Sequence, residues 1–133
     1  LVNVSTRGFL GTGTNGAMIA GLIIGSGNGA AKVLVRVLGP SLAAFGISNY
    51  LGDPSVQVHD ANGSTLTVND DWKHGPGSPG LSQQAEIEQT GLQPTNDLES
   101  AIIATLEPGN YTAIVGGKNN GTGVALVEVF NLP

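Results

Sequence analysis

Residues 56–68 read VQVHDANGSTLTV, and this stretch decides how the chain folds. Apolar and polar residues alternate on both sides of the segment Ala61–Ser64, which is the pattern of two half-buried β-strands. The Asn62-Gly63 dipeptide favours a tight turn because both residue types accept a positive φ at little cost. The stretch therefore predicts an antiparallel hairpin, with strands near residues 55–60 and 64–69.

The same alternation, punctuated by glycine and proline, recurs along the rest of the chain. Further strands are expected near residues 1–6, 17–24, 31–38, 101–106, 111–116 and 123–130. Val33–Leu38 is nearly continuous in apolar residues, which indicates a central strand covered on both faces. Pro108-Gly109 predicts a second hairpin.

Two short helical turns are expected at residues 40–45 and 82–89, and Ser82 is the predicted cap of the second. Eight strands at this spacing predict an all-β fold, an antiparallel β-sandwich of jelly-roll or Greek-key type. At 133 residues we expect a single β-sandwich domain over 1–133.

The composition is poor in charge and rich in glycine. Charged residues make up only 11% of the chain, against roughly 25% in an ordinary soluble domain. Much of the surface must therefore be uncharged, or be covered by other subunits. Cysteine is absent, which excludes disulfides and thiolate metal sites. The apolar runs are far too short to span a bilayer.

The charges are unevenly distributed between the two parts of the sequence. Residues 1–52 contain Arg7, Lys32 and Arg36 and no acid, whereas residues 53–133 contain two lysines and all ten acids, a net charge of −8. Three scattered basic residues do not form a nucleic-acid-binding patch. Charges of opposite sign in the two parts can help subunits meet head to tail, although the acids can equally just follow the later loops.

Both chain ends have the pattern of strands. The missing initiator methionine is typical of a chain whose leader has been removed, of a fragment, or of an engineered chain. A terminal strand either pairs within its own sheet or offers its backbone groups to a neighbour, and we expect a neighbour. The expected assembly interface comprises Leu1, Val2, Val4, Val124, Leu126, Val127, Val129 and Phe130.

No set of residues has a convincing catalytic pattern, and an enzyme is not expected. Gly11–Gly16 matches the dinucleotide fingerprint GxGxxG, but no acid lies about 20 residues downstream. His59 and His74 are the only imidazoles, and no nucleophile-elbow motif accompanies them. The catalytic set is therefore predicted to be empty.

Calcium is the most credible ligand, because several acids lie in predicted loops and Ca²⁺ prefers hard oxygen ligands. The candidate metal ligands are Asp53, Asp70 and Asp71, although a turn capped by the NDD segment at 69–71 is the favoured interpretation of these residues. Sequons for N-glycosylation occur at Asn3, Asn62, Asn110 and Asn120.

Several motifs occur together in a fixed order along the chain. They are RVLGPSL at 36–42, VHDANG at 58–63, NDDW at 69–72, GLQPTN at 91–96, the run 98–115 and the ending 123–130. Together they resemble a module that recurs, often in tandem, in large secreted bacterial surface proteins. The Pro-Gly-x-Tyr segment at 108–111 is similar to that of pre-peptidase C-terminal domains. The resemblance implies an extracellular β-sandwich without catalytic residues.

The expected function is that of an extracellular or cell-surface structural module, which assembles with copies of itself into a filament or array. Assembly would use terminal strands, in a donor-strand-like way, or the faces of the sandwich. The alternative is a carbohydrate- or Ca²⁺-binding accessory domain of a secreted hydrolase. Copies of the chain, and possible glycans, are the expected partners.

Overall fold

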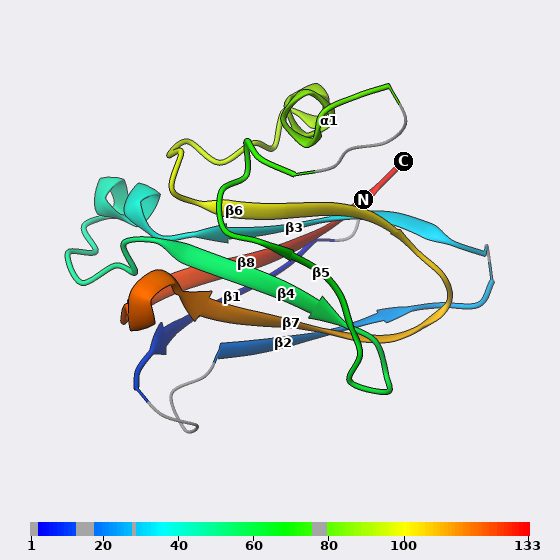
Figure 1. The fold of residues 1–133 in the computed structure, drawn as a ribbon, viewed down its shortest axis with the longest axis horizontal. Coiled ribbons are helices and arrows are strands. Elements are labelled where there is room, and N and C mark those ends of the chain that lie inside the picture. The colour runs from blue at the N-terminus through cyan, green and yellow to red at the C-terminus, as the bar shows by residue number, and fades with distance from the viewer. Residues whose placement is uncertain (1–2, 13–17, 28, 76–79) are drawn as a thin grey trace.

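The computed structural model describes residues 3–12, 18–27, 29–75 and 80–133, which form two antiparallel four-stranded sheets packed face to face (Figure 1). Leu1, Val2 and most of the Gly11–Gly16 motif lie outside the described residues. The elements follow one another as β1 (Asn3–Leu10), β2 (Met18–Ile24), β3 (Ala31–Leu38), η2 (Pro40–Phe45), β4 (Pro54–His59), β5 (Thr65–Asn69), α1 (Gln83–Thr90), β6 (Ser100–Leu106), β7 (Gly109–Gly117), η3 (Lys118–Asn120) and β8 (Gly123–Leu132).

The strand order is β1-β8-β3-β6 in one sheet, here called sheet A, and β2-β7-β4-β5 in the other, sheet B. The predicted all-β sandwich is confirmed, and each of the eight expected strands is present. β3 lies between β8 and β6 with Val33, Leu34, Val35 and Val37 buried, as its continuous apolar run predicted. No helix in the described part of the chain is long and apolar enough to cross a membrane.

The main core fills the space between the two sheets. It is built from alternate residues of each strand, such as Val35 and Val127 from sheet A and Val56 and Val115 from sheet B. All four side chains are essentially inaccessible to solvent. The period of two along each strand therefore accounts for the core.

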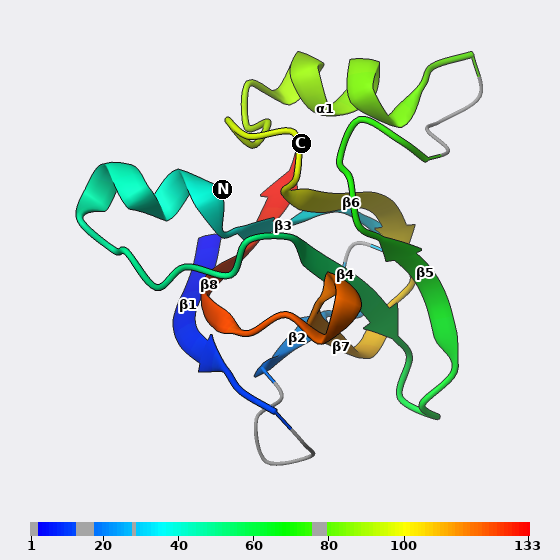
Figure 2. The same cartoon turned by 60° about the vertical axis from the view of Figure 1, so that its left-hand side comes forward.

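A second, smaller core lies on the outer face of sheet A, beneath α1 (Figure 2). Trp72 and Ile87 pack there against Leu34, Ala101 and Phe130. The helix begins at Ser82, whose hydroxyl accepts a hydrogen bond from the Ala85 N–H, as predicted for the cap. The outer face of sheet A is consequently covered at β3, β6 and the end of β8, whereas β1 keeps an exposed outward aromatic residue, Phe9, at 60%.

The turn predictions differ in outcome. The β4–β5 hairpin is confirmed: Asp60 Oδ1 accepts hydrogen bonds from the backbone of Asn62 and Ser64. The hairpin predicted at Pro108-Gly109 is wrong, because this turn carries the chain from β6 in sheet A to β7 in sheet B. A Pro-Gly pair specifies a reversal of direction but not the strand to which the next segment bonds.

The terminal strands pair with each other, which corrects the expectation that they pair with a neighbour. β1 is antiparallel to β8 over the whole range from Asn3↔Phe130 to Leu10↔Gly123. β8 also pairs with β3 on its other side, so it is a central strand with no free edge. An incoming strand therefore has no place to bond along β8.

Glu99 clamps the loops at one end of the sandwich. Its side chain is fully buried, and its carboxylate accepts hydrogen bonds from the N–H groups of Gly39 (2.8 Å), Ser41 (2.9 Å) and Asn96 (3.2 Å). The Ser41 hydroxyl donates a fourth, at 2.5 Å. Because a buried carboxylate needs such donors, Glu99 ties the β3–η2 connection to the loop before β6.

Candidate functional site

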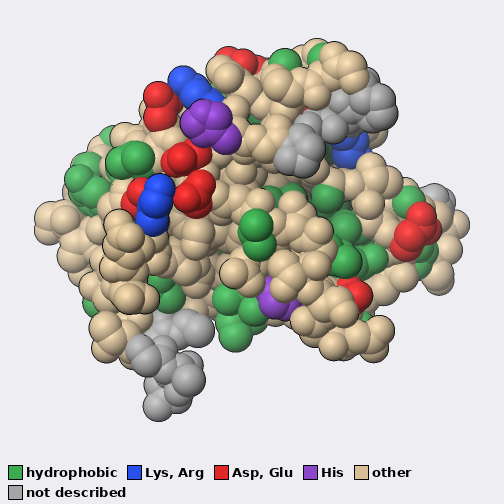
Figure 3. Space-filling model, in the orientation of Figure 1, with side chains coloured by type: hydrophobic (Ala, Val, Ile, Leu, Met, Phe, Trp, Pro, Cys, Tyr) green, Lys and Arg blue, Asp and Glu red, His purple; other side chains and the backbone are tan. Residues whose placement is uncertain are grey.

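The two sheets differ in what covers their outer faces. α1 and its flanking segments lie over sheet A, whereas no described helix lies over sheet B (Figures 1 and 2). The uncovered side of sheet B is called here the open face. It is made of the outward residues of β2, β7, β4 and β5, and it faces the viewer in Figure 3.

The open face is uncharged along its strands and carries exposed aliphatic side chains. Ile19 and Ile23 of β2 are 59% and 80% exposed, and Leu66 and Val68 of β5 are 46% and 59% exposed. Between them Ile114, Thr112 and Asn110 of β7 and Ser55, Gln57 and His59 of β4 point the same way. Charged side chains gather instead at one end of the face (Figure 3). These aliphatic side chains form two groups, on β2 and on β5, which are separated by the mainly polar outward residues of β7 and β4.

Three strand edges are free of backbone partners among the described residues. They are the edges of β1, β2 and β5, the outermost strands on their sides of the sheets. The edge of β6 is different, because the Asn69 side chain accepts from the Ala101 N–H at 3.0 Å and the Gln83 side chain donates to the Ala101 carbonyl at 3.0 Å. These two side chains cap β6 at Ala101, the second residue of the strand, and such capping is one way in which proteins prevent unwanted strand addition.

An open crevice of about 840 Å³ adjoins the end of β2. Its apolar lining includes Val4, Leu22, Val33, Val129 and Leu132. Lys32 is its one charged lining residue, and this lysine is paired with Glu86 at 2.5 Å. The sandwich core is thus incompletely closed beside the free edges of β1 and β2.

The predicted assembly residues of β8 do not form a surface. Val127 and Phe130 are buried, and Val129 packs against the main core. Val124 and Leu126 are half-buried on a strand that is paired on both sides. Of the predicted set, Val4 is 54% exposed and lines the crevice, while Leu1 and Val2 lie outside the described residues.

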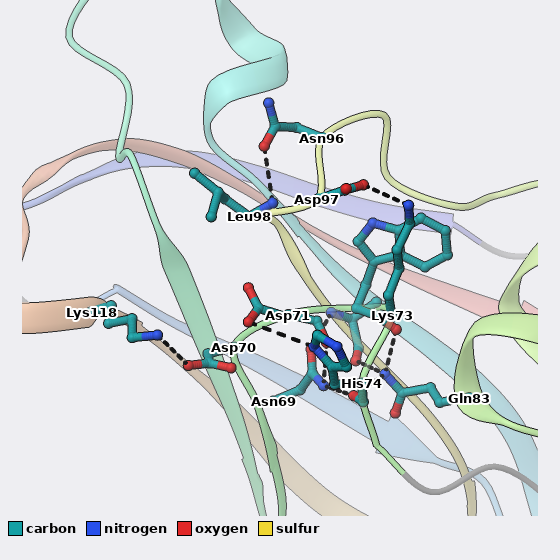
Figure 4. Close-up of polar contacts among 12 residues, drawn as sticks. Asn69, Asp70, Asp71, Lys73, His74, Gln83, Asn96, Asp97, Leu98 and Lys118 are labelled. Carbon is teal, nitrogen blue, oxygen red and sulfur yellow. Dashed lines mark hydrogen bonds and ion pairs between the residues drawn. The ribbon is translucent and has the colours of Figure 1, made fainter.

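The charged end of the open face is a network of ion pairs (Figure 4). Lys118 approaches Asp70 at 3.5 Å and Lys73 approaches Asp97 at 2.9 Å, all with substantial exposure. Such exposed pairs contribute little to stability. Asn69 supports the turn by donating to the His74 carbonyl at 2.8 Å.

The predicted metal ligands Asp53, Asp70 and Asp71 lie near one another, but they do not form a ligand set. Within the described ranges, no three acidic or histidine side chains are arranged to hold a metal ion. Lys118 interacts with both Asp70 and Asp53. Burial raises the pKa of the Asp53 carboxyl, Asp71 and Asp70 raise it further, and Lys118 opposes them. Lys118 therefore already balances part of the negative charge that would attract a cation, and calcium binding at these carboxylates stays a prediction.

The two histidines lie apart and make local contacts. His59 contacts the Gln57 side chain at 2.9 Å and the Gly63 carbonyl at 3.2 Å, both within its own hairpin. The His74 side chain is 84% exposed, with its ring 3.8 Å from Asp71. The sequon residues Asn62, Asn110 and Asn120 are exposed, whereas the Asn3 side chain is not among those described.

The sequence contained a signal for the open face. MIAGLII, residues 18–24, is as continuously apolar as β3, yet β2 is an edge strand. A continuous apolar run normally indicates a strand covered on both faces. Because no described helix covers the outer face of sheet B, the outward apolar residues of β2, Ile19 and Ile23, remain exposed.

No protein-family model matches this sequence, and no curated protein sequence is significantly similar to it. Among solved structures, the fold is similar to the pre-peptidase C-terminal domain of a collagenase from Bacillus anthracis. The similarity covers 97% of this chain and 90% of that domain, with a TM-score of 0.56 and 15% sequence identity. At this identity the likeness shows the fold, which is a β-sandwich like that of a pre-peptidase C-terminal domain.

Proposed function

We propose that this chain is a non-catalytic structural module of an extracellular or cell-surface protein, and that it associates with copies of itself through sheet B. The observation that carries the proposal is the contrast between the sheets. Most of the outer face of sheet A lies beneath α1, with Phe9 of β1 exposed beside it, whereas sheet B presents a wholly uncovered, uncharged face with four exposed aliphatic side chains. A similar fold in a domain of a bacterial collagenase supports the extracellular setting.

Burial of this surface between copies would favour association. Full burial of an aliphatic side chain contributes about 1.5–3 kcal/mol, and Ile19, Ile23, Leu66 and Val68 are each roughly half exposed or more. An uncharged surface also carries no desolvation penalty for ions. The apolar crevice beside β2 offers additional space for a partner's side chains.

The test is sedimentation equilibrium over a wide range of protein concentration. The wild-type mass is expected to rise with concentration, and Ile19→Lys is expected to weaken association at least tenfold, about 1.4 kcal/mol. Phe45→Lys is the matched control, because Phe45 is 78% exposed on η2 and lies off sheet B. A single-chain mass at every concentration, or equal effects of both substitutions, would refute the proposal.

The second candidate is an accessory domain of a larger secreted enzyme, in which sheet B would contact a substrate. The likeness to a collagenase domain is the observation that favours it. It is distinguished by binding of the purified chain to collagen or polysaccharide, with Ile19→Lys as the surface variant. Binding to such a substrate by a chain that remains monomeric would favour the accessory role.

A further inference from the structure

We propose that copies of this chain join head to tail, with the free edge of β2 in one copy pairing with the free edge of β5 in the next. This inference rests on the proposed self-association and names the two strand edges that meet. The open face stays continuous across the junction, and of its aliphatic side chains only those of β2 and β5 come into contact between copies. The partner at each edge is a second copy of the chain, so both strands of the junction consist of described residues. The product is an open-ended array in which sheet B continues from copy to copy.

The first argument is the number of free edges in each sheet. Sheet B is free at both outer strands, β2 and β5, among the described residues. In sheet A, the side chains of Asn69 and Gln83 cap β6 at Ala101. Just before β6, the backbone N–H of Trp72 donates to the Glu99 carbonyl. A sheet with two free edges can receive a copy on each side, and such head-to-tail contacts need not close.

The second argument is strand direction. The four strands of sheet B alternate in direction, so β2 and β5 are antiparallel to each other. When a second copy has the same orientation, its β2 is therefore antiparallel to the β5 that it meets. The extended sheet keeps its alternation without interruption, which is the hydrogen-bonding arrangement of the rest of the sheet.

The third argument is the chemistry of the outward side chains. Side chains alternate between the two faces of a strand, so a shift of the register by one residue would turn them to the opposite face. Only every second register therefore keeps the open face continuous across the junction. Two such registers place either Ile19 beside Val68 of the next copy or Ile23 beside its Leu66. Both registers create an aliphatic cross-strand pair. In the first register Gly21 lies opposite Leu66 and in the second opposite Val68, and glycine has no side chain that could clash with either.

The fourth argument is charge. The side of the sandwich formed by β1 and β2 carries Arg7 and lies within the part of the sequence that has no acid. Asp60 and Asp70 flank β5, with Asp71 beside them and Lys118 as a partial counter-charge. Unlike sides therefore attract each other. A two-fold dimer through β2 would instead bring together two sides that both carry Arg7.

The absence of cysteine allows a direct test by disulfide cross-linking. Neighbouring residues on paired antiparallel strands lie within the Cα distance that a disulfide requires. We would make the double variants Ile19→Cys/Val68→Cys and Ile23→Cys/Leu66→Cys, oxidise each at high concentration, and separate the products on a non-reducing gel. Phe45→Cys is the control for random collisions.

One of the two double variants is expected to give a ladder of multimers. A mixture of its two single variants should then give dimers that need both partners. Raising the salt from 150 to 500 mM should reduce the ladder severalfold. Negative-stain images should show a repeat of about 19 Å, which is four strand spacings.

Three results would overturn the junction. The first is a mass that rises with concentration but no ladder in either double variant, which leaves the proposed function standing. The second is cross-linking of Ile19→Cys with Ile23→Cys instead, which indicates a two-fold dimer. The third is a yield of disulfide-linked dimer from Phe45→Cys that equals the yield from the mixture of the two single variants. A single-chain mass at all concentrations would refute the proposed function together with the junction.

Discussion

Replacing Glu99 by glutamine tests the physical basis of the loop clamp without changing the size of the side chain. The wild-type carboxylate is fully buried and accepts four hydrogen bonds, three from backbone N–H groups and one from the Ser41 hydroxyl. An amide has one acceptor oxygen and one donor group. Whichever way it is oriented, at least one of the N–H groups of Gly39, Ser41 and Asn96 then faces another donor.

The expected loss follows from these contacts. A buried polar group left without a partner costs about 1–3 kcal/mol, and the remaining hydrogen bonds lose the contribution of the charge. We expect Glu99→Gln to lower the free energy of unfolding by about 2–4 kcal/mol, a large part of the 5–15 kcal/mol that stabilises a typical domain. This corresponds to a decrease in Tm of roughly 10 °C for a chain of this size.

The assay is urea unfolding followed by the fluorescence of Trp72, the only tryptophan, which is 4% exposed. Glu88→Gln makes the same chemical change at an exposed position of α1 and should alter stability by less than about 0.5 kcal/mol. A loss below about 1 kcal/mol for Glu99→Gln, or equal losses for the two variants, would refute the reasoning about buried carboxylates.

Three further results are expected. A Cβ at position 39 would lie 2.0 Å from the Leu51 carbonyl oxygen, so Gly39→Ala should prevent folding or cost more than about 3 kcal/mol, while Gly52→Ala, which meets no neighbour, should leave Tm nearly unchanged. Because burial raises the pKa of Asp53, its ionised form opposes folding. Asp53→Asn should therefore stabilise the protein at pH 7 in urea titrations, and this gain should shrink as the pH falls through the native pKa; a gain that grows would contradict it. Since Lys118 lies beside the loop carboxylates, millimolar Ca²⁺ should leave the melting curve unchanged, and a clear rise in Tm would show that the ligand analysis is wrong.

Local chemistry made the strands and the β4–β5 turn predictable. The alternation of apolar and polar residues identifies which residues of a strand share a face. Asn62-Gly63 identifies the hairpin because the backbone conformation of a tight turn depends on only a few adjacent residues. The helix cap at Ser82 was predictable for the same reason. Each of these features depends on residues close together in the sequence.

Features that depend on distant partners were not predictable. Pro108-Gly109 has the chemistry of a hairpin turn, but the neighbours of β6 and β7 are β3, β2 and β4, which lie far away in the sequence. The terminal strands looked like free ends because nothing near β8 reveals that β3 will pair with it. The apolar run of β2 is typical of a strand covered on both faces, yet the outer face of sheet B is uncovered and leaves Ile19 and Ile23 exposed.

The same limit applies to the candidate site. The acids Asp70 and Asp71 are adjacent in sequence and suggested a ligand cluster, but the lysine that reaches Asp70 comes from position 118. The open face combines residues of four strands, so its uncharged character emerges only when the strand order is known. Low overall charge and the continuous apolar run of residues 18–24 were the indications in the sequence that such a face exists.

Hydrogen–deuterium exchange at low and high protein concentration tests the central claim, self-association through sheet B, most directly. If β2 and β5 pair between copies, amides within residues 18–24 and 65–69 should exchange more slowly at high concentration, while the β1 edge at residues 3–10 should not change. Exchange that is independent of concentration everywhere, or protection confined to β1, would contradict the account.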